Sequence, residues 1–383
     1  MRTSARAAAA VATAALAAYA GCGTPAAVRA SLHARDSGPA LLSFRMTTAT
    51  AGWAFTAKRV LRTVDGGRSW NDRTPTGLND TTAELGPGGG PPANVAIIGV
   101  ASAWLAAASP GAVRIFRTSD AGAHWHTATV TPAAITGLPR TDVPIVLGLD
   151  AVDARTGLLL TSNGGAGAGS EDVELYRTRD SGITWTLIAA ATQQHPSPGG
   201  FPAGGIKTGL GFVSVKRGWL TGYRGSQSGA WLYATDDGGR TWRAATLPTP
   251  RRYPTSGQLT FPPDFTGRAG VLPTLWPAQR ATIFYTTRDG GLHWHPTAPV
   301  PSSGGNALRA WSWPNQTHGF AAPSGTLCAT TNGGHSWKCR PAPRVLQHIV
   351  ELQFPTPRLG WALSGTQLFR TADGGITWTP TKG

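Results

Sequence analysis

The sequence predicts an all-β protein, a seven-bladed β-propeller of four-stranded antiparallel blades. The first observation is a turn that recurs seven times: Thr, any residue, Asp or Asn, any residue, Gly, two residues, Trp. The Asp or Asn positions are 55, 60, 57, 52, 43 and 41 residues apart, which leaves room for about four strands per unit. Each turn also joins two stretches of alternating polarity, such as Gln367-Leu368-Phe369-Arg370, which is typical of a β-hairpin.

Each residue type of the turn has a local structural role. A short Asp or Asn side chain accepts N–H bonds inside its own turn, and Gly adopts positive φ at little steric cost. The Thr hydroxyl adds a side-chain bond, and the Trp offers a large apolar face that is expected to pack between neighbouring sheets. No ligand is needed, so these residues are predicted to be structural. The seven copies are Thr63/Asp65/Gly67/Trp70, Thr118/Asp120/Gly122/Trp125, Thr178/Asp180/Gly182/Trp185, Thr235/Asp237/Gly239/Trp242, Thr287/Asp289/Gly291/Trp294, Thr330/Asn332/Gly334/Trp337 and Thr371/Asp373/Gly375/Trp378.

A second element precedes the turn in most units, with a small residue followed by a large apolar one. For blade 5, which lacks a clear copy, Arg268 is taken as the equivalent of the large residue. The copies are Gly52-Trp53-Ala54, Ala103-Trp104-Leu105, Gly157-Leu158-Leu159, Gly218-Trp219-Leu220, Gly319-Phe320-Ala321 and Gly360-Trp361-Ala362.

Together the two elements resemble a known family. Ser/Thr-x-Asp-x-Gly-x-x-Trp is similar to the Asp box, or bacterial neuraminidase repeat, and the pair resembles the photosystem II assembly and stability factor-like propellers, with a more distant likeness to the sialidase superfamily. The resemblance covers roughly residues 40 to 380. It implies one Asp box in each third-to-fourth-strand turn, and it defines a scaffold rather than an activity.

The domain organisation follows from the repeats and the N-terminus. Residues 40–383 form the propeller, with blades at about 40–73, 93–130, 144–189, 207–247, 257–298, 306–341 and 346–381. Residues 1–21 read as a secretory signal peptide, because two arginines precede an uncharged Ala-rich run of 14 residues that is too short to span a membrane. Residues 22–39 would be a tail or linker.

Two cleavage sites compete in this leader. Ala18-Tyr19-Ala20 suits a signal peptidase that leaves Gly21 first, whereas Tyr19-Ala20-Gly21-Cys22 resembles a lipobox with Cys22 as the lipidated residue. The position of Cys22 directly after the apolar run favours lipidation. The protein is therefore expected outside the cytoplasm, lipid-anchored to the cell membrane, with free secretion as the alternative.

The other two cysteines, Cys328 and Cys339, are placed symmetrically about the sixth turn. Positions mirrored about a hairpin turn face each other across the strands. In an oxidising compartment they are expected to form a disulfide, the alternative being two buried thiols.

The chain is strongly basic, with 34 Lys and Arg against 19 Asp and Glu. Without Arg2 and Arg6 of the leader the formal charge is +13. Such a surface favours anionic partners, namely phospholipid head groups, wall polymers or acidic protein surfaces. Export argues against nucleic acid.

The longest loops are predicted on the face opposite the repeated turns. Connections from second to third strand and from blade to blade emerge there, and the Gly/Pro-rich segments lie before blades 2, 3 and 4. The repeated turns are then expected to mark an inert face. Arginine mixed with aromatic residues is typical of protein-binding surfaces, the alternative being solvated arginines and aromatics that pack their own loops. Candidate partner-binding residues are Arg140, Tyr223, Arg224, Trp231, Arg251, Arg252, Tyr253, Trp276 and Arg280.

Catalytic and metal-binding constellations are weak in this sequence. Of the four glutamates, Glu84, Glu171 and Glu174 fall in insertion loops, and Glu351 on an inner strand. Asp150, Asp153 and Asp264 lie near first strands and could supply an acid and a base, although such carboxylates are more often turn residues. His124/His126 and His293/His295 lack a third ligand.

We therefore expect no catalytic residues, metal or cofactor. The predicted function is a non-catalytic protein-binding or assembly scaffold at the cell envelope, with an acidic partner surface. The alternative is a carbohydrate-binding or sialidase/glycosidase-like protein, for which a glycan is the partner.

Overall fold

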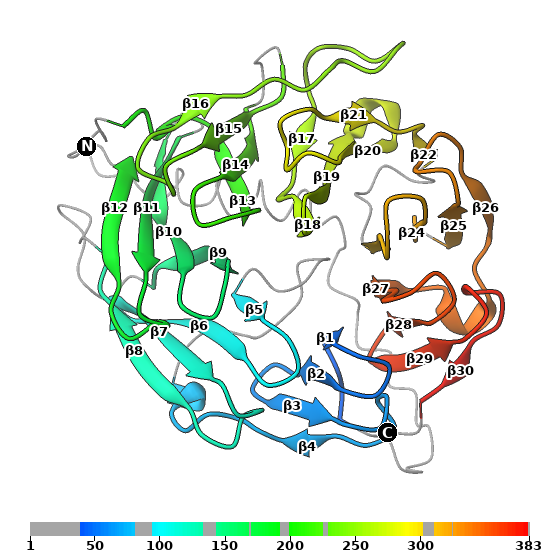
Figure 1. Ribbon diagram of the computed structural model, residues 1–383, viewed down its shortest axis with the longest axis horizontal. Helices are drawn as coiled ribbons and strands as arrows, with labels where there is room; N and C mark the ends of the chain where they lie inside the picture. Colours follow the sequence, from blue (N-terminus) through cyan, green and yellow to red (C-terminus); the bar gives the residue numbers. More distant parts are fainter. Residues whose placement is uncertain are drawn as a thin grey trace, which may run out of the picture.

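The computed structural model describes residues 39–80, 94–132, 143–167, 170–191, 199–224, 229–301, 310–323 and 325–381. Seven antiparallel sheets stand around a central axis and follow one another in chain order (Figure 1). The predicted seven-bladed propeller is thus confirmed. The predicted signal peptide, Cys22, Glu84 and Arg140 lie outside the described residues.

In each blade the first strand lies nearest the axis and the following strands lie progressively further out (Figure 1). Blades 1 to 4 contain β1 (Ser43–Met46), β2 (Gly52–Phe55), β3 (Val60–Thr63) and β4 (Asn71–Asp72); β5 (Val95–Ile97), β6 (Ala103–Ser109), β7 (Ala112–Thr118) and β8 (His126–Val130); β9 (Ile145–Ala151), β10 (Gly157–Gly167), β11 (Ser170–Thr178) and β12 (Thr186–Ala191); and β13 (Ile206–Phe212), β14 (Gly218–Tyr223), β15 (Leu232–Thr235) and β16 (Arg243–Ala244).

Blade 5 departs from the four-stranded pattern, because its inner strand is split in two and an extra strand, β22, pairs with β20. Three short 3-10 helices, η1 (Leu78–Asp80), η2 (Pro277–Gln279) and η3 (Arg344–Leu346), lie in connections. Blades 5 to 7 contain β17 (Leu259–Thr260), β18 (Asp264–Thr266), β19 (Ala269–Trp276), β20 (Ala281–Thr287), β21 (His295–Pro296) and β22 (Val300–Pro301); β23 (Trp311–Ser312), β24 (Gly319–Ala321), β25 (Thr326–Thr330) and β26 (Lys338–Pro341); and β27 (Ile349–Gln353), β28 (Gly360–Ser364), β29 (Gln367–Thr371) and β30 (Thr379–Pro380).

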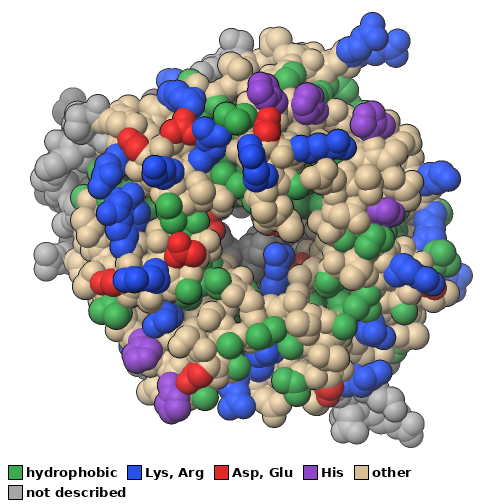
Figure 2. Space-filling model, in the orientation of Figure 1, with side chains coloured by type: hydrophobic (Ala, Val, Ile, Leu, Met, Phe, Trp, Pro, Cys, Tyr) green, Lys and Arg blue, Asp and Glu red, His purple; other side chains and the backbone are tan. Residues whose placement is uncertain are grey.

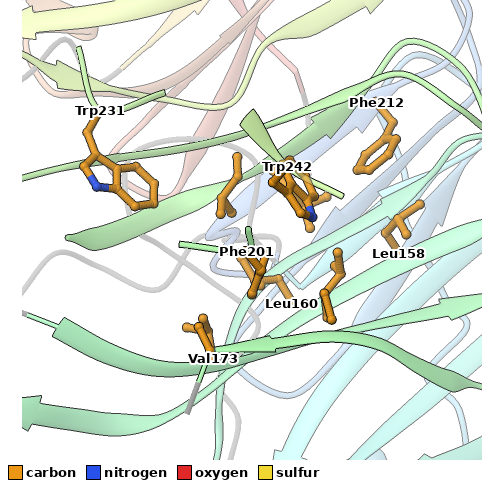
Figure 3. Close-up of a cluster of buried hydrophobic side chains, with 12 residues drawn as sticks. Leu158, Leu160, Val173, Phe201, Phe212, Trp231 and Trp242 are labelled. Atoms are coloured by element: carbon orange, nitrogen blue, oxygen red, sulfur yellow. The ribbon is translucent and has the colours of Figure 1, made fainter. Parts of the chain in front are cut away.

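The apolar core lies between neighbouring blades. At the border of blades 3 and 4, Leu158 and Leu160 of β10 pack against Phe212 of β13 and against Trp242 (Figure 3). The Trp242 ring meets Phe212 edge-on, with centroids 6.3 Å apart. Burial of such large side chains is the main favourable contribution to folding, so each blade depends on its neighbours for stability.

The large residue of the second strand reaches the turn of the next blade. Trp219 of blade 4 meets Trp294 of blade 5 edge-on at a centroid distance of 5.8 Å. A Cβ on Gly291 would overlap the Trp219 ring, and Gly291 has φ of +77°. Glycine is therefore required there both for its backbone conformation and for the close approach of the indole.

The tryptophans of the seven recurring turns pack against the apolar clusters between blades, but to different depths. Trp242 and Trp294 are buried between sheets, as expected. The other five are half-buried, and each packs one side of its indole against an interblade cluster. These five are Trp70, Trp125, Trp185, Trp337 and Trp378.

All seven tryptophans come directly before the outermost strand of their blade. In these five, one part of the indole packs against an interblade cluster and the rest meets solvent. Trp125, for example, meets Trp53 edge-on at 6.3 Å, and its Nε1–H donates to the Arg73 carbonyl at 2.8 Å. An indole has an apolar body and a polar N–H, which suits such a border position. The five remain structural residues, at the rim of the core.

The ring closes without a shared strand. Blade 1 comes entirely from β1–β4 and blade 7 entirely from β27–β30. Phe44 and Leu61 of blade 1 pack against Trp361 and Leu363 of blade 7. The Trp361 Nε1–H also donates to the carbonyl of Gly66 at 3.1 Å. Closure thus rests on side-chain packing and hydrogen bonds across this border.

A disulfide links the two outer strands of blade 6. Cys328 of β25 and Cys339 of β26 are directly paired, and the structure joins their sulfurs at 2.00 Å. No helix in the described part of the chain is long and apolar enough to cross a membrane.

Candidate functional site

The seven recurring turns, which we call the repeat turns, satisfy their own polar groups. In blade 3 the Thr178 hydroxyl donates to Asp180 Oδ1 at 2.7 Å and accepts the Gly182 N–H at 2.9 Å. The hydroxyl and the N–H of Thr184 donate to Asp180, and together with the Thr178 hydroxyl they lower the pKa of this carboxyl to about 2. The carboxylate is committed to its turn and stays ionised at neutral pH.

In blade 6 the repeat turn keeps this arrangement with Asn332 in the Asp position. The Thr330 hydroxyl donates to Asn332 Oδ1 at 2.9 Å, and Asn332 Nδ2 donates to the Ser336 hydroxyl at 2.9 Å. An amide therefore serves where the other six blades use a carboxylate. These contacts give the repeat turns the structural role that the sequence predicts.

Four of the predicted contact residues form an exposed basic set on the face opposite the repeat turns. Arg224 follows β14, Arg251 and Arg252 lie between β16 and β17, and Arg280 precedes β20. All four are exposed, and no ion pair between described residues involves them. We call these four residues the arginine set.

The predicted aromatic contact residues lie beneath these loops instead. Trp231 and Trp276 are 3% and 1% exposed, and Tyr253, half-buried, meets the Trp276 ring edge-on at 5.2 Å. The expectation that the two tryptophans contact a partner is thus wrong, because both rings pack inside the protein. Tyr223 is half-buried. The aromatics support the loops that carry the arginine set.

A buried lysine that the sequence analysis did not single out lies beside Trp231. Lys207 Nζ donates to the carbonyls of Ala203 at 3.1 Å and Gly205 at 3.0 Å, and it lies 5.6 Å from the Trp231 ring centroid. Burial lowers the pKa of Lys207 to about 8, although Glu171 opposes this shift. The sequence contains one signal for this buried lysine, because Lys207 is the one charged residue in the otherwise largely apolar strand β13.

Two of the carboxylates considered as acid and base lie close enough to interact near the axis. Asp150 accepts the N–H of Phe212 at 2.7 Å. Asp150 is half-buried on the inner strand β9. Burial of its carboxyl and the charge of Asp264 raise the pKa of Asp150 to about 7, although the bond from Phe212 opposes the shift. Asp153 is exposed and accepts the N–H groups of Arg155 and Thr156 in its own turn.

The repeat-turn face carries a pocket that the sequence analysis missed. The pocket has a volume of about 390 Å³ and lies between blades 5 and 6. Figure 2 views this face, and histidines gather at the upper right over blade 5 and its border with blade 6. Exposed aliphatic residues also project from the repeat turns, namely Val64, Ile183, Leu292 and Ile376. The repeat-turn face, which the sequence predicts to be inert, thus carries a pocket and exposed apolar side chains.

The histidine pairs do not form a metal site. His293 Nδ1 lies 2.7 Å from Asp289 Oδ2, and His124 Nδ1 lies 2.7 Å from Asp120 Oδ2, so each ring is held by the carboxylate of its own turn. Within the residues that the structure describes, no three His, Cys, Asp or Glu side chains form a group that could hold a metal ion.

No family model and no curated protein matches this chain. Among solved structures it is similar to YCF48 bound to D1 peptide (16% identity, TM-score 0.52, covering 87% of this chain and 93% of that chain). YCF48 from Cyanidioschyzon merolae is similar at 16% identity and a TM-score of 0.54, over 87% of this chain and 95% of that chain.

The chain is also similar to a GH74 enzyme from Niastella koreensis, at 14% identity and a TM-score of 0.54, over 90% of this chain and 54% of that chain. It thus spans about half the length of that enzyme. At these identities the likenesses show a shared propeller fold and leave the function open.

Proposed function

We propose that this protein is a protein-binding or assembly scaffold that works at the cell envelope without catalysis. The observation that carries the proposal is the arginine set. Its four guanidinium groups stand exposed on neighbouring loops of blades 4 and 5, without ion pairs among the described residues. Arginine is enriched where proteins bind one another, because its planar guanidinium forms paired hydrogen bonds with carboxylates.

The partner that fits this surface is an acidic protein segment. Arg251 and Arg252 are adjacent in sequence, and Arg252 adopts a left-handed backbone conformation with φ of +69°. Such a conformation is uncommon for a residue with a side chain and marks a sharply turned loop. Tyr253 and Trp276 pack beneath it and give it a firm base. The YCF48 structure with D1 peptide bound shows that a protein of this fold can take a peptide.

The test begins with recovery of the partner, by crosslinking in cells followed by mass spectrometry. The affinity of the recovered partner is then measured for the wild type and for Arg251→Glu/Arg252→Glu. We expect the double variant to bind at least about tenfold more weakly, with a smaller dependence on salt. Arg155→Glu/Arg358→Glu reverses two exposed charges outside these loops and serves as the control. Equal affinity of all three proteins would rule the docking surface out.

Export and lipidation of Cys22 are part of the proposal. They rest on the leader and on the Cys that follows it. Cells that express the wild type or Cys22→Ser are labelled with a fatty acid, and we expect label in the wild type alone. Equal labelling of both proteins would contradict the anchor, whereas an unlabelled protein in the medium would indicate free secretion.

A carbohydrate-active protein is the second candidate, and the Asp150–Asp264 pair favours it. A carboxyl whose pKa is about 7 can donate a proton at neutral pH, and a neighbouring carboxylate is what a glycosidase mechanism requires. A panel of fluorogenic glycosides tests this. Turnover that disappears in Asp264→Asn would establish the enzyme, and no turnover by the wild type would exclude those substrates.

A further inference from the structure

We propose that the pocket between blades 5 and 6, on the repeat-turn face, binds a neutral saccharide. This site is separate from the arginine set and does not depend on the protein-binding proposal. Its walls come from the inner hairpin and repeat turn of blade 5 and from the inner strand, first loop and repeat turn of blade 6.

The pocket exists because blade 5 lacks the large residue that other blades place at this border. In blade 4, Trp219 pairs with Ala234 and reaches the repeat turn of blade 5. The residue at the same register in blade 5 is Val271, which pairs with Thr286. This corrects the assignment of Arg268 as the equivalent residue. Because valine is much smaller than tryptophan, a space remains between Val271 of blade 5 and the facing residues of blade 6.

One wall of the pocket is aromatic. Trp311 and Trp313 are two residues apart, so their side chains point to the same side of the chain. Both pack on Phe284 of blade 5, with ring centroids 5.8 Å and 5.7 Å away, and both remain half-buried and line the pocket. A half-exposed indole offers a flat apolar face of the kind on which the C–H groups of a sugar ring stack.

Beside Ala269, Gly270 and Val271, the remaining lining is polar and contains both hydrogen-bond donors and acceptors. Asn315 and Gln316 contribute amides, which donate and accept, and Arg288 contributes donors. Asp264 at the inner end contributes acceptors, and imidazoles line the outer part. The hydroxyl groups of a sugar also donate and accept, so a mixed lining next to an aromatic wall matches a saccharide better than a purely apolar ligand.

The charge of the lining selects a neutral ligand. The lining contains one arginine, Arg288, and two carboxylates, Asp264 and Asp289. An anionic ligand would meet two carboxylates and would be disfavoured. Burial acts to raise the pKa of Asp289, but hydrogen bonds from His293 and Thr287 outweigh it and keep this pKa well below its usual range. The Asp289 carboxyl is therefore not a proton donor. Of the Asp150–Asp264 pair only Asp264 lines the pocket, so the raised-pKa carboxyl of that pair lies outside the lining. The pocket is therefore assigned to binding.

The test uses a matched pair of probes, lactose and sialyllactose, within a wider array of neutral disaccharides that includes cellobiose and chitobiose. Binding to the full chain is followed by calorimetry and by tryptophan fluorescence. We expect at least one neutral disaccharide to bind and its acidic counterpart to bind more weakly. Failure of every neutral member to bind would overturn the proposal, and so would a preference for sialyllactose.

Val271→Trp is the decisive variant, because it gives blade 5 the residue that blades 1, 2, 4 and 7 have and so should fold. We expect it to weaken saccharide binding at least about tenfold. Trp311→Ala, which removes part of the aromatic wall, provides a second test if Val271→Trp fails to fold. Arg251→Glu/Arg252→Glu is the control and should bind the sugar as the wild type does. Unchanged binding by both pocket variants would overturn the assignment.

Discussion

The carboxylate of Glu351 in blade 7 accepts the backbone N–H of Phe44 in blade 1 at 2.9 Å. It also accepts the hydroxyl of Ser43 at 2.8 Å. Further along β27, Gln353 accepts the Met46 N–H at 2.6 Å and donates to the Met46 carbonyl at 2.8 Å. Side chains of β27 therefore bond to the backbone of β1 and link the two ends of the ring, where no strand is shared.

The Glu351 contact predicts that stability falls as the pH rises. Burial raises the pKa of Glu351 to about 7, although the bonds from Phe44 and Ser43 oppose the shift. Since the folded pKa exceeds the unfolded value of 4.5, the folded state binds more protons between these values. The contribution to stability is complete below the unfolded pKa and is lost as the pH rises through about 7.

Glu351→Gln tests this directly. The amide keeps an acceptor for Phe44 and cannot ionise, so we expect the variant to match the wild type near about pH 4.5 and to exceed it by up to about 3 kcal/mol near about pH 8. Denaturant unfolding across this range measures the difference. Asp150 shifts in the same direction and leaves a residual slope. A wild-type slope that is unchanged in the variant would contradict the assignment.

Glu351→Ala measures how much the hydrogen bond to Phe44 contributes to stability, independently of the charge of Glu351. Alanine leaves the buried N–H of Phe44 without its acceptor, which costs about 1–3 kcal/mol. We expect this variant to be less stable than Glu351→Gln at every pH in the range. Equal stability of the two variants would mean that the bond to Phe44 contributes little to the closure of the ring.

The repeat made the fold predictable, and it also explains what the sequence left hidden. Seven copies of one turn determine the number of blades, and the mirrored placement of Cys328 and Cys339 determines that they face each other. What the sequence does not predict are the places where one blade differs in structure from the others. The inner strand of blade 5 is split around residues 261–263, so the equivalence of Val271 emerges only from its pairing with Thr286.

The candidate sites were less predictable for a related reason. Exposure of the arginine set follows from loop position and charge, which the sequence displays. Burial of Trp231 and Trp276 depends on how their segments fold back onto neighbouring strands. The pocket requires a small residue on one blade and two tryptophans on the next, and no single segment of sequence contains both.

The burial of the tryptophans in the repeat turns also could not be predicted, because it depends on residues outside the repeat. All seven occupy one position of the repeat, yet Trp242 is buried and Trp185 is half-buried. Trp242 is covered by Phe201 and Phe212, with ring centroids 5.7 Å and 6.3 Å away. Phe201 comes from the connection before blade 4, outside the repeat. Burial at this position therefore depends on which side chains the neighbouring connection supplies.

The repeat turns predict a difference between an amide and a methyl group at the Asp position. Asp180→Asn places in blade 3 the amide that Asn332 provides in blade 6, so we expect a loss below about 1 kcal/mol. Asp180→Ala removes the acceptor for Thr178 and Thr184 and should cost about 1–2 kcal/mol. Thermal unfolding of the two variants compares them, and equal losses would show that the hydrogen bonds are not what stabilises the turn.

The ionised form of Asp180 also predicts a loss of stability in acid. Its folded pKa of about 2 lies below the unfolded value of 3.8, so the contribution is present above the unfolded pKa and is lost as the pH falls towards the folded one. Because the side chain is only half-buried, solvent screens its charge and the effect of one turn is small. We expect Asp180→Asn to reduce the slope of stability against pH below about pH 4. An unchanged slope would place the acid sensitivity elsewhere.

The approach of Trp219 to Gly291 predicts a severe effect from one methyl group. Gly291→Ala adds a Cβ where the Trp219 ring already lies, at a backbone φ of +77°. We expect a loss of more than about 3 kcal/mol in unfolding free energy, because the indole must leave its position between blades 4 and 5.

Gly365→Ala is the matched control, since Gly365 has φ of +60° and no atom within 4 Å of an added Cβ. It should lose about 1 kcal/mol from backbone strain alone. Similar losses in the two variants would mean that strain, rather than the contact with Trp219, accounts for the glycine in the repeat turn.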